Sequence, residues 1–136
     1  MMARILVAED QQDLRDMIAF TLRLEGHQVL TTADGEEALT QAEDAEPELF
    51  ILDIHMPRIT GYDLCKQIKS QPRFKDAPII IISARGGQDE IQAGLDAGAQ
   101  IYMRKPFAPQ DLLANVNLLL KPAQIAGAPA NRTQTD

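Results

Sequence analysis

The sequence predicts an α/β domain with five parallel strands in one open sheet and helices on both of its faces. Three observations lead to this prediction. Short apolar runs alternate with amphipathic segments of helical spacing, and this strand–helix order occurs five times along the chain. The runs show no polar–apolar alternation, which is typical of strands buried on both faces. Successive strands separated by helices favour crossover connections and therefore a parallel sheet.

Each predicted strand is a short run of mainly apolar residues. The five runs cover residues 4–8, 28–32, 48–52, 79–83 and 100–104. Residues 79–83 read IIIIS, and their four consecutive β-branched side chains give the strongest strand signal in the chain. Residues 100–104 read QIYMR and are more polar. All five runs have an ordinary length for strands.

Helices are predicted between the strands and after the last one. They are expected over residues 11–25, after Asp34, over residues 61–70 and 89–97, and from Pro109 to Leu120. Gly26 and Gly98 stand where a helix commonly ends on a glycine. Asp34 and Glu37 have the spacing of a capping box, and Pro109 suits a first helical turn.

Composition narrows the possible functions. The net charge of −7 argues against direct binding of nucleic acid, which needs clustered Lys and Arg. The single cysteine, Cys65, allows no internal disulfide and favours a reducing compartment. No apolar run is long enough to span a bilayer, and the first residues lack the apolar core of a signal peptide. A cytoplasmic domain without direct membrane contact is therefore expected.

The character of the chain changes after Lys121. Its 136 residues suit one domain with a proper core, which we assign to residues 1–121. Residues 122–136 contain prolines, a glycine and small polar residues without periodicity, so they are expected to form a disordered tail or a truncated linker. The sequence contains no helix-turn-helix and no cyclase or kinase motif. Any output is therefore expected through a partner protein or through an output domain missing from this sequence.

Polar side chains follow four of the five predicted strands. Glu9 and Asp10 follow the first strand, Asp53 follows the third, Ser83 ends the fourth, and Lys105 follows the fifth. Because parallel strands end at one edge of a sheet, and ligands bind beyond that edge, we expect these side chains to converge.

Each of these groups has an ordinary structural explanation on its own, because acids after strands often cap helices and most lysines are solvated. Together they describe a phosphoryl-transfer site. Three neighbouring carboxylates repel one another, and Mg²⁺, which prefers oxygen ligands, relieves that repulsion. One carboxylate could then attack phosphorus, while a hydroxyl and an ammonium group hold the phosphoryl oxygens.

These residues resemble the receiver domain of two-component response regulators, in the single-domain form of the chemotaxis type. Asp53 lies in DIHMPRITG, which is similar to the family pattern Asp-x-x-Met-Pro-x-x-x-Gly. The Glu9–Asp10 pair, the Ser83–Ala84 step and the segment YMRKPF around Lys105 match the remaining family elements in order and spacing. The resemblance covers about residues 3–121.

The resemblance implies a flavodoxin-like fold with strand order 2-1-3-4-5. It implies that Asp53 is phosphorylated by a phosphohistidine on a histidine kinase or a histidine phosphotransfer protein. Mg²⁺ would be held by Glu9, Asp10, Asp53 and the backbone carbonyl of His55. Ser83 and Lys105 would contact the phosphoryl oxygens. The domain would catalyse only its own phosphorylation and dephosphorylation.

The resemblance also implies a switch. Ser83 would move toward the phosphate and Tyr102 would rotate inward, which changes a surface made of the fourth helix, fifth strand and fifth helix, about residues 89–120. This surface would signal to an effector and could support a phosphorylation-dependent homodimer. The Lys105–Pro106 bond is expected to be cis. His55 and Arg85 occupy positions that tune the lifetime of the phosphoryl group.

Three other functions compete with this interpretation. A phosphatase of the haloacid dehalogenase type uses similar groups, but its nucleophile lies at the end of the first strand and a second Asp stands two positions on. Here the candidate nucleophile Asp53 follows the third strand, position 55 is His, and the acidic pair follows the first strand instead. A flavodoxin-like cofactor binder would need a glycine-rich phosphate loop, and AEDQQDL offers acids there instead. A non-phosphorylated interaction module on the same fold is the third alternative.

Overall fold

The computed structural model describes residues 2–120. Its strands are β1 (Arg4–Ala8), β2 (Gln28–Thr32), β3 (Leu49–Asp53), β4 (Ile79–Ser83) and β5 (Ile101–Arg104). Its helices are α1 (Gln12–Leu24), α2 (Gly35–Ala45), α3 (Gly61–Lys69), α4 (Gln88–Asp96) and α5 (Pro109–Leu119), with a short 3-10 turn, η1 (Pro72–Phe74). The predicted tail, residues 122–136, lies outside the described residues.

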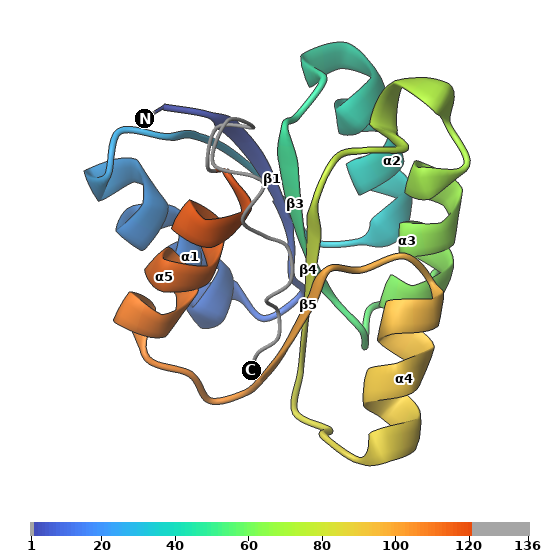
Figure 1. The fold of residues 1–136 in the computed structure, drawn as a ribbon. Coiled ribbons are helices and arrows are strands. Elements are labelled where there is room, and N and C mark those ends of the chain that lie inside the picture. Colours follow the sequence, from blue (N-terminus) through green and yellow to red (C-terminus); the bar gives the residue numbers. More distant parts are fainter. Residues whose placement is uncertain (1, 121–136) are drawn as a thin grey trace, which may run out of the picture.

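The five strands form one sheet in the order β2-β1-β3-β4-β5, and every neighbouring pair is parallel. Helices α1 and α5 cover one face, and α2, α3 and α4 cover the other (Figure 1). The predicted class, strand number and strand order are confirmed. All strands therefore end at the same edge, where the predicted site residues follow them.

The sheet separates two apolar cores. In β1, Leu6 packs toward the core beneath α2 and α3, whereas Ile5 and Val7 pack toward the core beneath α1 and α5. Every residue of β3 and β4 is buried, which explains why their sequences lack alternation. The strand ends are consequently held by rigid elements on both faces.

The ends of the elements agree with the predictions to within about two residues, as is usual for such boundaries. Gly26 and Gly98 end helices with φ of 94° and 113°. Asp34 caps α2, because its carboxylate accepts a hydrogen bond of 2.8 Å from the Glu37 amide. Helix α1 starts one residue later than expected, since Gln11 has extended backbone angles.

His27 gives the fold a dependence on pH. Its ring is buried, and Nδ1 accepts a hydrogen bond of 3.1 Å from the Ala3 amide. Burial lowers the pKa of His27 below its ordinary value of 6.5, so the unfolded chain takes up this proton first. The stabilisation of the fold by neutral His27 is complete above pH 6.5 and is lost as the pH falls toward the folded-state pKa of this residue.

We expect the His27→Asn variant to lose this dependence. Urea unfolding measures the free energy of unfolding at about pH 7.5 and about pH 5.5. As the pH is lowered between these values, the wild type should lose about 1 kcal/mol more of this free energy than the variant does. Equal losses in the two proteins would show that His27 does not contribute to the acid sensitivity of the fold.

Candidate functional site

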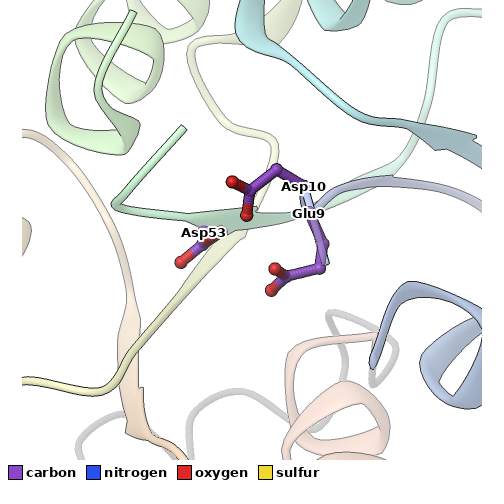
Figure 2. A group of neighbouring side chains, drawn as sticks. All are labelled: Glu9, Asp10 and Asp53. Atoms are coloured by element: carbon purple, nitrogen blue, oxygen red, sulfur yellow. The ribbon is translucent and has the colours of Figure 1, made fainter. Parts of the chain in front are cut away.

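Three carboxylates meet at the carboxyl edge of the sheet. Glu9 and Asp10 follow β1, Asp53 is the last residue of β3, and each offers an oxygen that lies within 4.8 Å of the others. Figure 2 shows the three side chains gathered where these two central strands end. Glu9 and Asp53 are buried, whereas Asp10 is exposed. The predicted convergence of these residues is present in the structure.

Lys105, which directly follows β5, lies close to two of these carboxylates. Its ammonium Nζ lies 3.0 Å from Glu9 Oε1 and 3.2 Å from Asp53 Oδ1. The lysine side chain is 16% exposed, so this ion pair is largely shielded from water. One partly buried positive charge therefore faces two buried carboxylates.

Burial disfavours the ionised forms of Glu9 and Asp53. Burial raises the pKa of Glu9 to about 7, although the Gln11 amide opposes the rise and the carboxylate of Asp53 adds to it. Burial also raises the pKa of Asp53, while the Lys105 ammonium opposes that rise. A second cation at this site would favour the ionised form of both groups.

The donor set fits a hard metal ion. Within residues 2–120, Glu9 Oε1 and Asp53 Oδ1 are buried and face Lys105 without the geometry of a hydrogen bond. Both oxygens therefore retain coordinating capacity, and Asp10 adds a third carboxylate that is open to solvent. Carboxylate oxygens are the ligands that Mg²⁺ prefers, so this acidic cluster could bind a metal ion.

The other predicted residues lie on β4 and β5 and in the loops that follow β3 and β4. The Ser83 hydroxyl is buried and accepts a hydrogen bond of 3.1 Å from the Arg85 amide. Tyr102 is half-buried, and its hydroxyl donates a hydrogen bond of 2.8 Å to the Arg85 carbonyl. The side chains of His55 and Arg85 are exposed, and the Lys105–Pro106 bond is cis as expected.

The chain matches the family described as response regulator receiver domain over residues 5–117. It belongs to this family. The acidic residues after β1 and at the end of β3, together with Lys105 after β5, thus lie in a receiver domain of two-component response regulators. In the part of this receiver domain that the structure describes, no helix is long and apolar enough to cross a bilayer.

Known relatives support the same assignment. The receiver domain is 35% identical over 133 residues to the alkaline phosphatase synthesis transcriptional regulatory protein PhoP of Bacillus subtilis, covering 98% of this chain and 54% of PhoP. It spans about half the length of the curated relatives it matches.

Solved structures show the same fold. A response regulator from Chloroflexus aurantiacus is 37% identical with a TM-score of 0.84, covering 88% of this chain and 98% of that one. The chemotaxis response regulator CheY4 of Vibrio cholerae is 34% identical with a TM-score of 0.84, covering 88% of this chain and 100% of its own.

Two tyrosines of the receiver domain hold the segment between β4 and α4. Tyr102 bonds to the Arg85 carbonyl at the start of this segment. Tyr62, from α3, donates a hydrogen bond of 3.1 Å to the Glu90 carbonyl in the first turn of α4. Sequence reasoning missed Tyr62, because its partner lies 28 positions away and no local pattern marks the contact.

The loop after Asp53 is fixed to its neighbours. The Gly61 amide donates a hydrogen bond of 2.9 Å to the Ile54 carbonyl. Arg58 has a φ of 72°, and its guanidinium lies 3.0 Å from Asp34 and 3.2 Å from Glu36. These contacts join the loop that follows the central carboxylate to the start of α2.

We expect the Gly61→Ala variant to be destabilised by about 2 kcal/mol, as is typical of overpacking. An added Cβ would overlap the Asp53 carbonyl oxygen and lie 2.8 Å from Ile54 Cα, and neither backbone group can move freely. Urea unfolding measures the effect. Gly87→Ala is the control, because its Cβ would meet only the end of the flexible Glu90 side chain. Equal losses would contradict the close packing inferred at Gly61.

Proposed function

We propose that this receiver domain accepts a phosphoryl group on Asp53 from a phosphohistidine donor in a reaction that requires Mg²⁺. The donor would be a histidine kinase or a histidine phosphotransfer protein. The observation that carries the proposal is the convergence of Asp53, Glu9, Asp10 and Lys105 at one edge of the sheet. In this proposal the domain signals, and it catalyses only its own phosphorylation and dephosphorylation.

The chemistry follows from the positions of these groups. A carboxylate oxygen of Asp53 attacks phosphorus, the phosphorus–nitrogen bond of the donor breaks, and the histidine leaves. The Lys105 ammonium already faces Asp53 and would hold a phosphoryl oxygen, with the Ser83 hydroxyl on another. Bound Mg²⁺ would supply further positive charge to the transferring group. Glu9, Asp10, Asp53 and the His55 carbonyl would hold it.

The switch that follows would begin at the Ser83–Arg85 segment. Phosphorylation makes Asp53 more negative and adds oxygen acceptors. Ser83 would leave the Arg85 amide for the phosphate, and Tyr102 would leave the Arg85 carbonyl and turn inward. Both hydroxyls bond to the same residue in the structure, so the two movements are readily coupled.

The readout would be the surface of α4, β5 and α5. Within α4 itself, only Gly94 is buried, so the outer side of that helix remains available to a partner. The partner would be an effector protein, an output domain or a second copy in a phosphorylation-dependent homodimer. The receiver would comprise residues 1–121 of the chain.

His55 and Arg85 would slow the loss of the phosphoryl group, because both exposed side chains are large enough to hinder the attacking water. We expect His55→Asn and Arg85→Ala each to accelerate phosphate release by about threefold, which corresponds to a barrier lowered by about 0.7 kcal/mol. A time course of phosphate release from the phosphorylated proteins measures the rates. Unchanged rates in both variants would contradict this role.

Acetyl phosphate tests the proposed function against its alternatives. Intact-mass spectrometry after incubation with acetyl phosphate and Mg²⁺ should show the addition of one phosphoryl group, and chelation of Mg²⁺ should prevent it. Repeated turnover of a phosphoester would instead indicate a phosphatase. The absence of any adduct would favour an interaction module that works without phosphorylation.

A further inference from the structure

Arg15 contacts the main chain of the acidic loop. Its Nη1 donates a hydrogen bond of 2.8 Å to the Glu9 carbonyl, and it also lies 3.5 Å from the Asp10 carbonyl. The side chain is half-buried on the first turns of α1. Side chains on a helix lean toward its N-terminus, so an arginine at this place reaches back over the loop that precedes the helix.

The contact completes the immobilisation of Glu9. The Glu9 amide donates to the Thr32 carbonyl at 3.0 Å, and Oε2 accepts from the Gln11 amide at 3.0 Å. Oε1 faces Lys105, and the Glu9 carbonyl is held by Arg15. If the Arg15 contact were removed, the peptide plane between Glu9 and Asp10 could rotate, and the carboxylates on both sides would turn with it.

We propose that Arg15 is a positioning residue for the metal site, which holds the loop so that the Glu9 and Asp10 carboxylates converge with Asp53. This inference rests on the proposed function, because it assumes that the acidic cluster binds Mg²⁺. A guanidinium suits the role, since it stays charged at all relevant pH values and presents donors in a rigid plane. Groups that orient metal ligands in this way typically change metal affinity by about 10–100-fold when removed.

The same helix provides a matched control. Arg23 lies near the other end of α1, and its Nη2 donates a hydrogen bond of 2.8 Å to the Val29 carbonyl of β2. Both arginines therefore make one short guanidinium–carbonyl bond, but only Arg15 bonds to the acidic loop. Any effect common to both substitutions reflects the general loss of a helix-to-main-chain contact.

The experiment compares Arg15→Gln with Arg23→Gln in the full chain. Isothermal titration calorimetry with MgCl₂ should show that the dissociation constant rises about tenfold in R15Q and stays within about twofold of wild type in R23Q. Thermal unfolding without metal should show similar Tm decreases in both. Phosphorylation by acetyl phosphate should keep its maximal rate in R15Q but need about tenfold more Mg²⁺ to reach half of it.

The outcomes separate the two proposals. Wild type that binds Mg²⁺ while R15Q and R23Q show equal affinities would overturn the role of Arg15 and leave the proposed function intact. Wild type that binds no Mg²⁺ would overturn both. Should R15Q not fold, Arg15→Lys carries the same comparison, because a lysine retains one donor and is expected to weaken Mg²⁺ binding less than about tenfold yet more than R23Q does.

Discussion

The Lys105→Met variant is expected to lose about 3 kcal/mol of folding free energy at pH 8 without Mg²⁺. The substitution removes the ammonium that faces the buried carboxylates of Glu9 and Asp53 and leaves both without a cation. Removing one partner of a buried ion pair is more destabilising than its net contribution suggests, because the remaining charges stay desolvated. Methionine retains most of the side-chain volume, so the loss reports charge rather than packing.

Two further conditions identify the cause of that loss. Burial already raises the pKa of Glu9 and of Asp53, and losing Lys105 raises both further, so the variant should recover stability as the pH falls and these carboxylates take up protons. Added Mg²⁺ should also restore part of the stability. Urea unfolding at about pH 8 and about pH 6, with and without MgCl₂, measures the free energy of unfolding under all four conditions. A variant as stable as wild type at pH 8 would contradict the buried ion pair.

The Asp53→Asn variant is expected to lose phosphorylation by acetyl phosphate entirely while remaining folded. The neutral amide oxygen is a far weaker nucleophile than a carboxylate oxygen, and the substitution removes one of the three carboxylates of the cluster. Because burial raises the pKa of Asp53, the ionised carboxylate costs stability near neutral pH, and the variant should have a higher free energy of unfolding than wild type without metal. Its Mg²⁺ affinity should fall at least about tenfold, since a charged ligand is lost.

Intact-mass spectrometry, calorimetry with MgCl₂ and urea unfolding check these three expectations on one protein sample. Asp63→Asn is a suitable control, because this acid lies on the first turn of α3, outside the acidic cluster. Phosphorylation of D53N at the wild-type rate would place the acceptor elsewhere, and unchanged Mg²⁺ affinity would remove Asp53 from the metal site.

The fold could be predicted because local signals and long-range packing agree. The four isoleucines of β4 lie on an interior strand of the sheet and are fully buried, as a continuous apolar run requires. The glycines at 26 and 98 have the positive φ values that end their helices. The exact end of β3 was missed by one residue, because Asp53 joins the strand through pairing with Ile82, and pairing with another strand leaves no mark in the local sequence.

The polar site could be predicted in part. Parallel strands end at one edge of the sheet, so the positions of the strand ends were enough to predict that four residues converge: Glu9, Asp10, Asp53 and Lys105. They did not determine hydrogen bonding within the site. The Ser83 hydroxyl bonds to the Arg85 amide, and the neighbour of Asp53 across the strand is Ile82 rather than Ser83. A side-chain rotamer cannot be derived from spacing along the chain.

Side chains that support the site were not predicted at all. Arg15 lies on a helix among other polar residues, and only the direction in which helical side chains lean could have indicated its contact with the Glu9 carbonyl. Arg58 bridges to Asp34 across 24 positions, and its φ of 72° is uncommon for a residue with a side chain. Such contacts depend on tertiary structure, for which one sequence holds no periodic signal.

Asp53 is proposed to accept a phosphoryl group at a site completed by Mg²⁺ and by Lys105. Fluorine NMR with beryllofluoride, an analogue of the phosphoryl group, tests this proposal. We expect a bound-fluoride signal in wild type that requires Mg²⁺, is absent in Asp53→Asn and is weakened in Lys105→Met. A signal that persists in Asp53→Asn, or that forms equally well without Mg²⁺, would contradict it.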